Sequence, residues 1–300
     1  MNDTLYGEGD APKAPPKPEA PKAPPKRGPA AAAPKPVTKP AAAVVFADIP
    51  TGKGERTVIY GPGGIGKTSL ALTAEGPVAV VDLDESLAIL QAQLPADVLA
   101  GVKLVGGTEP DFQTMRDALN APGWDDIKTI IVDSATKAEE LALAWVLKNV
   151  RTEKGQEAKR IEDYGFGKGY SHIYEAMLAL FADLDRHSRA GRNVIVICHE
   201  CTTTVPNPGG EDFLRWEPRL QAPAKGKNDV RARAIEWADH LLFIGYDINV
   251  SENKAKGHGS RTIYPQELPH CRAKSRTMQD QMVYQRHDAS VWRILRGDAE

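Results

Sequence analysis

Short, continuously apolar segments alternate with amphipathic segments along most of the chain. The apolar segments are rich in β-branched residues, and their length is that of strands buried on both faces of a sheet. They cover residues 56–60, 78–83, 129–133, 194–198 and 240–246. Strands that alternate with helices in this way are typical of a parallel sheet joined by crossover helices. The pattern therefore predicts a three-layer α/β fold around a mostly parallel central sheet.

Helical periodicity lies between these predicted strands. We expect helices over 68–74, 135–150 and 170–189. The last of them carries an apolar stripe at the spacing of one helix face, which we expect to pack in the core. The stripe consists of Ile173, Met177, Leu180, Phe181 and Leu184.

Residues 1–45 differ in composition from the rest and are dominated by Pro, Ala and Lys. Proline removes backbone donors and favours extended conformations, so we expect a disordered, solvated linker ahead of one folded domain over 46–300. Seven basic and four acidic side chains give the linker a net charge of +3. It is therefore either a spacer or an electrostatic aid to binding a nucleic acid or a protein.

The net charge of −2 excludes a uniformly basic nucleic-acid-binding protein, so such a contact needs a local patch or an arm. No segment approaches the roughly 20 apolar residues of a membrane span, and the N-terminus lacks the apolar core of a secretory signal. Three cysteines, Cys198, Cys201 and Cys271, are too few for a disulfide framework. The C-x-x-C pair lacks a second close pair of ligands, which disfavours zinc. We expect a cytoplasmic protein without a membrane partner.

A glycine-rich motif follows the first predicted strand. Its residues, Gly61-Pro62-Gly63-Gly64-Ile65-Gly66-Lys67-Thr68, fit G-x-x-x-x-G-K-[ST], and Ser69 follows in the predicted helix. The backbone N–H groups of such a loop point at phosphate oxygens, while the lysine neutralises the β- and γ-phosphates and the hydroxyl of Thr68 ligates Mg²⁺. The flanking strand and helix disfavour a plain glycine turn. The motif predicts a P-loop that binds Mg-ATP through residues 61–69.

A P-loop needs a second metal-binding carboxylate on a neighbouring strand. Asp133 ends the apolar run 129–133, about 65 residues after Thr68, and so lies at the edge of the sheet where α/β proteins bind ligands. The alternative is an aspartate that caps the following helix. We predict that Thr68 and Asp133 together hold the metal.

Hydrolysis also needs a group that orients or deprotonates the attacking water. The second predicted strand ends in Asp82-Leu83-Asp84-Glu85, which places carboxylates at the same edge. Asp84 is the first candidate, and Asp82 or Glu85 remains an alternative; the other two are then solvated or capping residues.

The strand 194–198 runs into His199 and Glu200. If it is inserted between the P-loop strand and the strand of Asp133, one of these residues reaches the γ-phosphate and can sense it. The alternative is an ordinary surface histidine.

These motifs, in this order, resemble phage-encoded ATPases with a RecA-type core, some of which are single-strand annealing recombinases. The resemblance covers roughly residues 46–280. It rests on the P-loop, 82–85, 130–134, 164–170, 194–200, 235–239 and 271–276.

The resemblance implies a RecA-like domain that hydrolyses ATP while it assembles as a homo-oligomer on single-stranded DNA in phage recombination or replication, in the cytoplasm of the host. Asp84 stands where RecA-like proteins carry a glutamate, so hydrolysis is slow or uses Glu85 instead. His199 stands where RecA has glutamine. Lys274 and Arg276 are candidates for reaching the γ-phosphate of a neighbouring subunit. A phage or host single-strand-binding protein is a candidate partner of the linker.

The segment between His199 and Trp237 is rich in Pro, Gly and basic residues and predicts a mobile loop that binds DNA backbone when ATP is present. Its basic residues are Arg215, Arg219, Lys225, Lys227, Arg231 and Arg233. Phe213 or Trp216 can stack on bases or lie in a subunit interface. The glycines of 165–169 predict a tight turn before a helix rather than a second phosphate site.

Two other functions remain open from the sequence. One is an oligomeric P-loop ATPase that remodels a protein or duplex DNA. The other is a nucleotide-dependent binding module with negligible turnover.

Overall fold

The computed structural model describes residue 48 and residues 51–105, 111–224, 227–251 and 254–297. The chain divides into two units, 1–49 and 50–300, and the helices and strands lie in the second. The linker predicted over 1–45 and its boundary with the folded domain lie outside the described residues, so both stay predictions.

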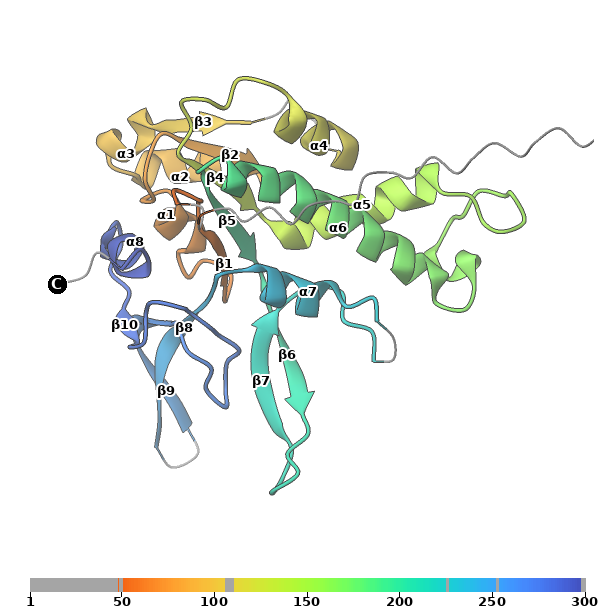
Figure 1. The fold of residues 1–300 in the computed structure, drawn as a ribbon. Helices are drawn as coiled ribbons and strands as arrows, with labels where there is room; N and C mark the ends of the chain where they lie inside the picture. The colour runs from red at the N-terminus through yellow and green to blue at the C-terminus, as the bar shows by residue number, and fades with distance from the viewer. Residues whose placement is uncertain (1–47, 49–50, 106–110, 225–226, 252–253, 298–300) are drawn as a thin grey trace, which may run out of the picture. The chain divides into compact units, whose positions relative to one another are not determined.

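An eight-stranded sheet forms the centre of the folded unit (Figure 1). In sheet order its strands are β10 (Met282–Val283), β9 (Lys254–Tyr264), β8 (His240–Ser251), β1 (Arg56–Tyr60), β5 (Asn193–Cys198), β4 (Thr129–Asp133), β2 (Val78–Asp82) and β3 (Val102–Leu104). The strands from β8 to β3 are parallel, and β9 and β10 add antiparallel pairs at one edge. β5 lies between β1 and β4, the insertion on which the interpretation of His199 depends.

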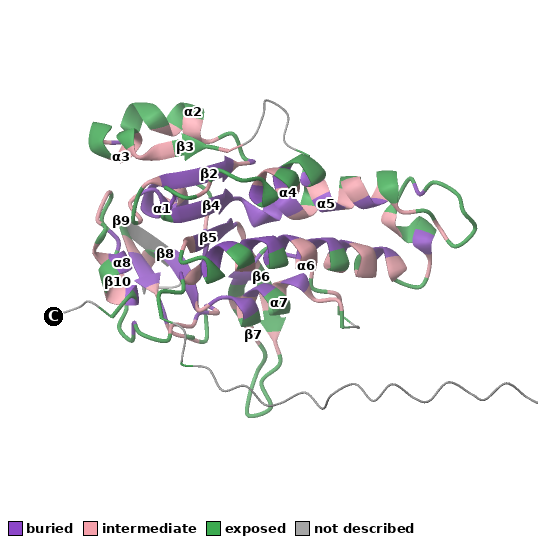
Figure 2. Cartoon of the chain, turned by 45° about the horizontal axis from the view of Figure 1, so that its top comes forward, coloured by how far each residue is buried: buried purple, intermediate pink, exposed green. Residues whose placement is uncertain are grey.

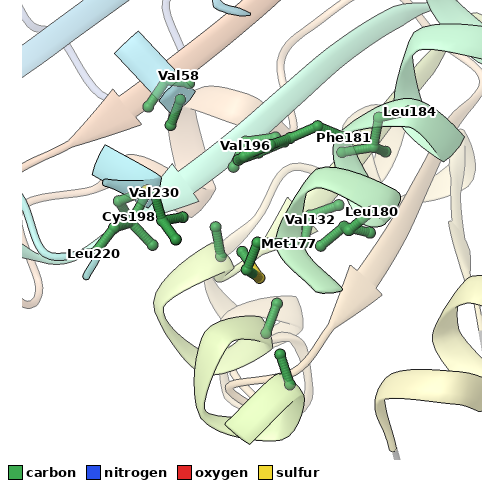
Figure 3. Close-up of a cluster of buried hydrophobic side chains, with 14 of the residues drawn as sticks. Val58, Val132, Met177, Leu180, Phe181, Leu184, Val196, Cys198, Leu220 and Val230 are labelled. Atoms are coloured by element: carbon green, nitrogen blue, oxygen red, sulfur yellow. The ribbon is translucent and has the colours of Figure 1, made fainter. Parts of the chain in front are cut away.

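Alternate residues of the central strands point to opposite faces of the sheet, so each strand contributes to two cores. On β1, Val58 belongs to one core and Ile59 to the other, and both are fully buried. Figure 3 shows part of the first core, where Val196 of β5 points toward Phe181 of a covering helix. The continuously apolar strands are therefore explained by burial on both sides (Figure 2).

Helices cover both faces. The first core is closed by α4 (Phe112–Asn120), α5 (Ala135–Asn149), α6 (Lys168–Arg189) and α7 (Val230–Trp237). The second is closed by α1 (Lys67–Ala71), α2 (Leu87–Leu90), α3 (Ala96–Ala100) and α8 (Ser290–Leu295). Two 3₁₀ turns, η1 (Gln91–Gln93) and η2 (Ile161–Tyr164), complete the described helical elements. The predicted three-layer α/β fold is confirmed, as is the burial of the apolar stripe on α6.

Several boundaries differ from the predicted ones. α1 ends at Ala71 rather than at residue 74, and β8 continues to Ser251. α6 begins at Lys168 because Gly165 and Gly167, with φ of +67° and +74°, complete the predicted turn just before it. Sequence reasoning missed α2, α3, α4, α8, β3, β9 and β10. Most of these elements are short, and α2 and α3 bury no residue completely, so they carry little apolar periodicity.

The mobile loop predicted between His199 and Trp237 is wrong. The segment forms a β-hairpin of β6 (Glu200–Val205) and β7 (Phe213–Pro218), followed by α7. β-branched residues favour the first strand, and a Pro-Gly-rich stretch at 206–210 provides the turn. Lys225 of the predicted basic loop lies outside the described residues.

Among the described helices, none has both the length and the apolar character needed to cross a bilayer.

Candidate active site

The P-loop joins the carboxyl end of β1 to α1 and depends on glycine at both of its ends. Gly61 has a φ of +151°, and a Cβ there would lie 2.2 Å from the carbonyl oxygen of Ile244. Gly66 has a φ of +109°, and a Cβ there would lie 2.7 Å from the hydroxyl of Tyr284. Only glycine lets the backbone approach its neighbours this closely.

Lys67 lies over this loop. Its Nζ donates hydrogen bonds to the carbonyl oxygens of Gly61 and Pro62, at 2.7 and 2.9 Å. Burial lowers the pKa of Lys67, while the negative charges of Glu200 and Asp133 act in the opposite direction. The ammonium group is thus held where phosphate oxygens can replace the two carbonyls as acceptors.

The structure brings Thr68 and Asp133 together. The Thr68 Oγ1 donates to Asp133 Oδ2 at 2.6 Å, although the two residues lie on different elements. Asp133 is buried, and burial raises its pKa to about 6 against the effect of the Thr68 hydrogen bond. A hydroxyl and a carboxylate are oxygen ligands of the kind that Mg²⁺ prefers, so the pair fits this ion.

The alternative role of Asp133 as a helix cap does not fit the structure. Ser134 is the N-cap residue of α5, and its Oγ accepts a hydrogen bond from the Lys137 N–H at 3.2 Å. The Asp133 carboxylate instead faces Thr68 and Ser86, whose hydroxyl lies 3.4 Å from Oδ2.

The structure separates the three carboxylates at the end of β2, where Asp82 is the last residue of the strand. Asp82 accepts hydrogen bonds from the backbone N–H groups of Ser86 and Leu87, so it caps the segment that enters α2. Glu85 has a φ of +54° and an exposed side chain. Asp84 Oδ2 lies 3.2 Å from Nε2 of His199, and this hydrogen bond is the main reason that the pKa of Asp84 is lowered. Asp84 and His199 therefore form a pair that no sequence spacing indicated.

His199 occupies the junction between β5 and β6. Its backbone N–H donates to Thr136 Oγ1 at 3.1 Å, and the Thr136 hydroxyl donates to the carbonyl of Arg219 at 3.1 Å. Thr136 belongs to the first turn of α5, directly after Asp133 and Ser134. The end of β5, the start of α5 and the end of the hairpin are thus tied together beside the P-loop.

Lys274 and Arg276 lie elsewhere. The Nζ of Lys274 is 3.4 Å from the carbonyl of Glu236, and Arg276 faces Asp239 at 3.7 Å. Both partners precede β8, at its amino end, whereas the P-loop follows the carboxyl end of the parallel strand β1. The structure does not bring these two cations to the P-loop of their own chain, and contact with a neighbour's phosphate stays a prediction.

Two residues that sequence reasoning missed hold the back of the P-loop. Arg261 donates from Nη1 to the carbonyl of Ile65 at 2.7 Å, and the Tyr284 hydroxyl donates to the carbonyl of Gly66 at 3.1 Å. Arg261 lies on β9 and Tyr284 directly follows β10. Both lie about 200 residues from the motif, and no local pattern marks them.

In the part of the chain that the structure describes, no group of three or more His, Cys, Asp or Glu side chains is arranged to hold a metal ion. The described cysteines are all free, and Cys198 and Cys271 are buried.

The model of a protein family described as AAA domain matches residues 53–277. This chain is a member of the AAA domain family. No curated protein matches it in sequence. Its family and its P-loop between β1 and α1 give this AAA domain the fold of a P-loop ATPase, which implies that it binds a nucleotide.

Solved structures give distant likenesses to this AAA domain. The flagellar accessory protein FlaH from Methanocaldococcus jannaschii is 12% identical, with a TM-score of 0.40, over 77% of this chain and 85% of that chain. A KaiC-like protein from Pyrococcus horikoshii is 13% identical, with a TM-score of 0.41, over 78% of this chain and 86% of that chain.

Proposed function

We propose that this AAA domain binds Mg-ATP at residues 61–69 and hydrolyses it. The observation that carries the proposal is the 2.6 Å contact between Thr68 Oγ1 and Asp133 Oδ2 beside the buried ammonium of Lys67. Lys67 balances the charge of the β- and γ-phosphates, and Thr68 and Asp133 hold the magnesium ion, which neutralises phosphate oxygens when it is bound.

The pair of Asp84 and His199 positions the attacking water. The lowered pKa of Asp84 keeps its carboxylate ionised, so it can accept a hydrogen bond from the attacking water and orient it. His199 orients that carboxylate through Nε2. Aspartate is one methylene shorter than the glutamate of RecA-like proteins, which fits slow turnover.

The test is ATP binding and hydrolysis by the purified full chain and by Lys67→Ala. We expect the variant to lose hydrolysis and most of its ATP affinity, because the buried cation over the loop is gone. Lys128→Ala, which removes an exposed lysine just before β4, is the matched control and should behave as the wild type. Equal hydrolysis by Lys67→Ala and the wild type would contradict the proposal.

We further propose that ATP turnover is coupled to single-stranded DNA through the β6–β7 hairpin. The hairpin begins at Glu200, directly after His199, so a change at the phosphate side reaches it without an intermediate element. Leu214 and Trp216 of β7 are 66% and 37% exposed. An exposed aromatic side chain such as that of Trp216 can stack on bases.

The basic residues of this region divide into two groups. Arg215 and Arg231 bind the buried carboxylate of Glu217, at 2.5 and 3.0 Å, so neither is free for DNA. Lys227 and Arg233 are exposed, whereas the exposed Arg219 adjoins His199 at the base of the hairpin. The DNA-binding surface proposed here is therefore smaller than the six cations of the sequence indicate.

The resemblance to phage annealing recombinases supports assembly as a homo-oligomer on single strands, strand annealing in recombination or replication, and a single-strand-binding protein as partner of the linker. ATP hydrolysis should rise with a single-stranded oligonucleotide, and a Leu214→Ala/Trp216→Ala variant should lose that rise. Stimulation by duplex alone, or turnover independent of DNA, would favour an ATPase that remodels duplex or protein. ATP binding without turnover would indicate a binding module.

A further inference from the structure

Arg219 lies beside His199 at the base of the hairpin. The ladder of β6 and β7 ends with the pair of Glu200 and Pro218. Just beyond it, the Arg219 N–H donates to the carbonyl of His199 at 2.8 Å. The backbone of Arg219 therefore lies beside that of His199, whose side chain reaches Asp84.

The backbone of Arg219 is held in this position from a second side. Its carbonyl accepts the hydrogen bond of Thr136 Oγ1 at 3.1 Å, and the same oxygen atom of Thr136 accepts from the His199 N–H. Thr136 is buried and lies in the first turn of α5, close in sequence to the proposed metal ligand Asp133. Arg219 is thus fixed to the same elements that carry the site.

The guanidinium of Arg219 has no partner among the described residues. Across the described ranges, Arg219 is exposed and forms no side-chain hydrogen bond or ion pair, whereas Arg215 and Arg231 of the same region both bind Glu217. An arginine anchored by its backbone, with a free fork of donors, is prepared for a ligand with several oxygens.

The charges of the site call for such a group. The carboxylates of Glu200, Asp133 and Asp84 all lie close enough to Lys67 to raise its pKa. Lys67 is the buried cation among them. A triphosphate adds about four negative charges, and phosphoryl transfer is accelerated by cations placed at the transferred group.

We propose that Arg219 contacts the γ-phosphoryl group of ATP bound by its own chain and stabilises the charge of the transition state. The inference rests on the proposed ATP hydrolysis and adds a catalytic residue to it. The water oxygen bonds to the γ-phosphorus, the bond from phosphorus to the β–γ bridging oxygen breaks, and ADP leaves with that electron pair. The water proton passes to the Asp84–His199 pair or to phosphate, and Arg219 keeps its proton throughout.

The experiment compares Arg219→Ala and Arg219→Lys with Arg189→Ala, a control that removes an exposed arginine at the end of α6. We expect Arg219→Ala to lower kcat by about 10²- to 10³-fold while the Kd for Mg-ATP changes less than about fivefold. Arg219→Lys should recover part of the rate, because it restores charge without the fork.

A binding measurement separates this role from a structural one. ADP with aluminium fluoride mimics the transferred group, and the wild type should bind it more tightly than ADP alone. Arg219→Ala should lose that gain at an unchanged Tm, whereas the control should keep it. Wild-type kcat and an undiminished gain in Arg219→Ala would overturn the proposal, provided that Lys67→Ala is inactive; if Lys67→Ala is active, the proposed ATPase function itself fails.

A mixing experiment tests whether the contact is made within one chain. When the inactive Lys67→Ala and Arg219→Ala proteins are combined, we expect no recovery of hydrolysis, because neither chain has both groups. Recovered activity would overturn the assignment to the same chain and place Arg219 at a neighbour's phosphate.

Discussion

Gly66 shows how closely the P-loop is packed at the level of one residue. Its φ of +109° is unfavourable for any other residue, and the Tyr284 hydroxyl occupies the space that a Cβ would take. The loop is therefore shaped by a contact from the C-terminal part of the chain as well as by its own glycines.

We predict that Gly66→Ala lowers Tm and abolishes ATP binding, because Tyr284 must move and the loop must change its backbone conformation. Differential scanning calorimetry and nucleotide titration measure both effects. Gly63→Ala, where no atom lies within 4 Å of the added Cβ, should lower Tm far less. Equal loss of stability in the two variants would show that the contact with Tyr284 is unimportant.

Glu139 is a partly buried carboxyl group outside the P-loop. Both of its oxygens accept from the backbone N–H of Gln221, and burial raises its pKa to about 7 from 4.5. Arg231 opposes this increase in the pKa, while Glu140 and Asp229 add to it. The proton is therefore bound more tightly in the folded state than in the unfolded state.

It follows that the stability contributed by this group is complete below pH 4.5 and is lost as the pH rises through about 7. We predict that Glu139→Gln removes this dependence, so the Tm of the wild type should fall relative to the variant between these pH values. Thermal unfolding of both proteins across the range provides the measurement. A constant difference in Tm would contradict the assigned pKa.

Tyr60 connects two elements, the P-loop strand β1 and the hairpin strand β7. Its hydroxyl lies 2.5 Å from the carbonyl oxygen of Arg272 and 2.9 Å from that of Trp216, and its ring packs on Phe243. Because Tyr60 directly precedes Gly61, the hairpin is joined to the P-loop here as well as at His199.

We predict that Tyr60→Phe lowers the free energy of unfolding by about 1–3 kcal/mol, since the carbonyl of Arg272 loses the Tyr60 hydroxyl as its donor. Denaturant unfolding measures the change. Tyr246→Phe, at a residue that is 41% exposed, is the control and should be nearly neutral. If both variants unfold alike, the Tyr60 hydroxyl does not stabilise the junction.

For the molecule as a whole, the placement of Arg276 matters. It is 72% exposed at the amino end of β8, away from its own P-loop, so a catalytic role requires a second subunit. A homo-oligomer with the amino end of one sheet against the P-loop of the next satisfies that requirement.

We predict that Arg276→Ala slows hydrolysis at least about tenfold, and that mixing it with Lys67→Ala restores activity, because one interface then has both groups. Hydrolysis by the mixture, with sizing in the presence of ATP and an oligonucleotide, is the measurement. Wild-type activity of Arg276→Ala would end the trans assignment and leave Arg219 as the proposed arginine.

The strands, the P-loop and Asp133 were predictable because each is encoded locally. A strand buried on both faces must be continuously apolar, and a loop that approaches phosphates must be rich in glycine. The β6–β7 hairpin was missed because the basic residues of this segment suggested a DNA-binding loop and obscured a β-branched pattern. In the structure Glu217 partly neutralises their charge.

Tertiary structure alone decided which carboxylate faces His199, which described arginine near the hairpin forms no side-chain pair, and what supports the back of the P-loop. Asp84 and His199 meet because β2 and β5 end at one edge of the sheet, where the backbone of Arg219 also joins that of His199. A local pattern records the burial and backbone conformation of each residue, but contacts between residues more than 100 positions apart exist only after the strands have paired.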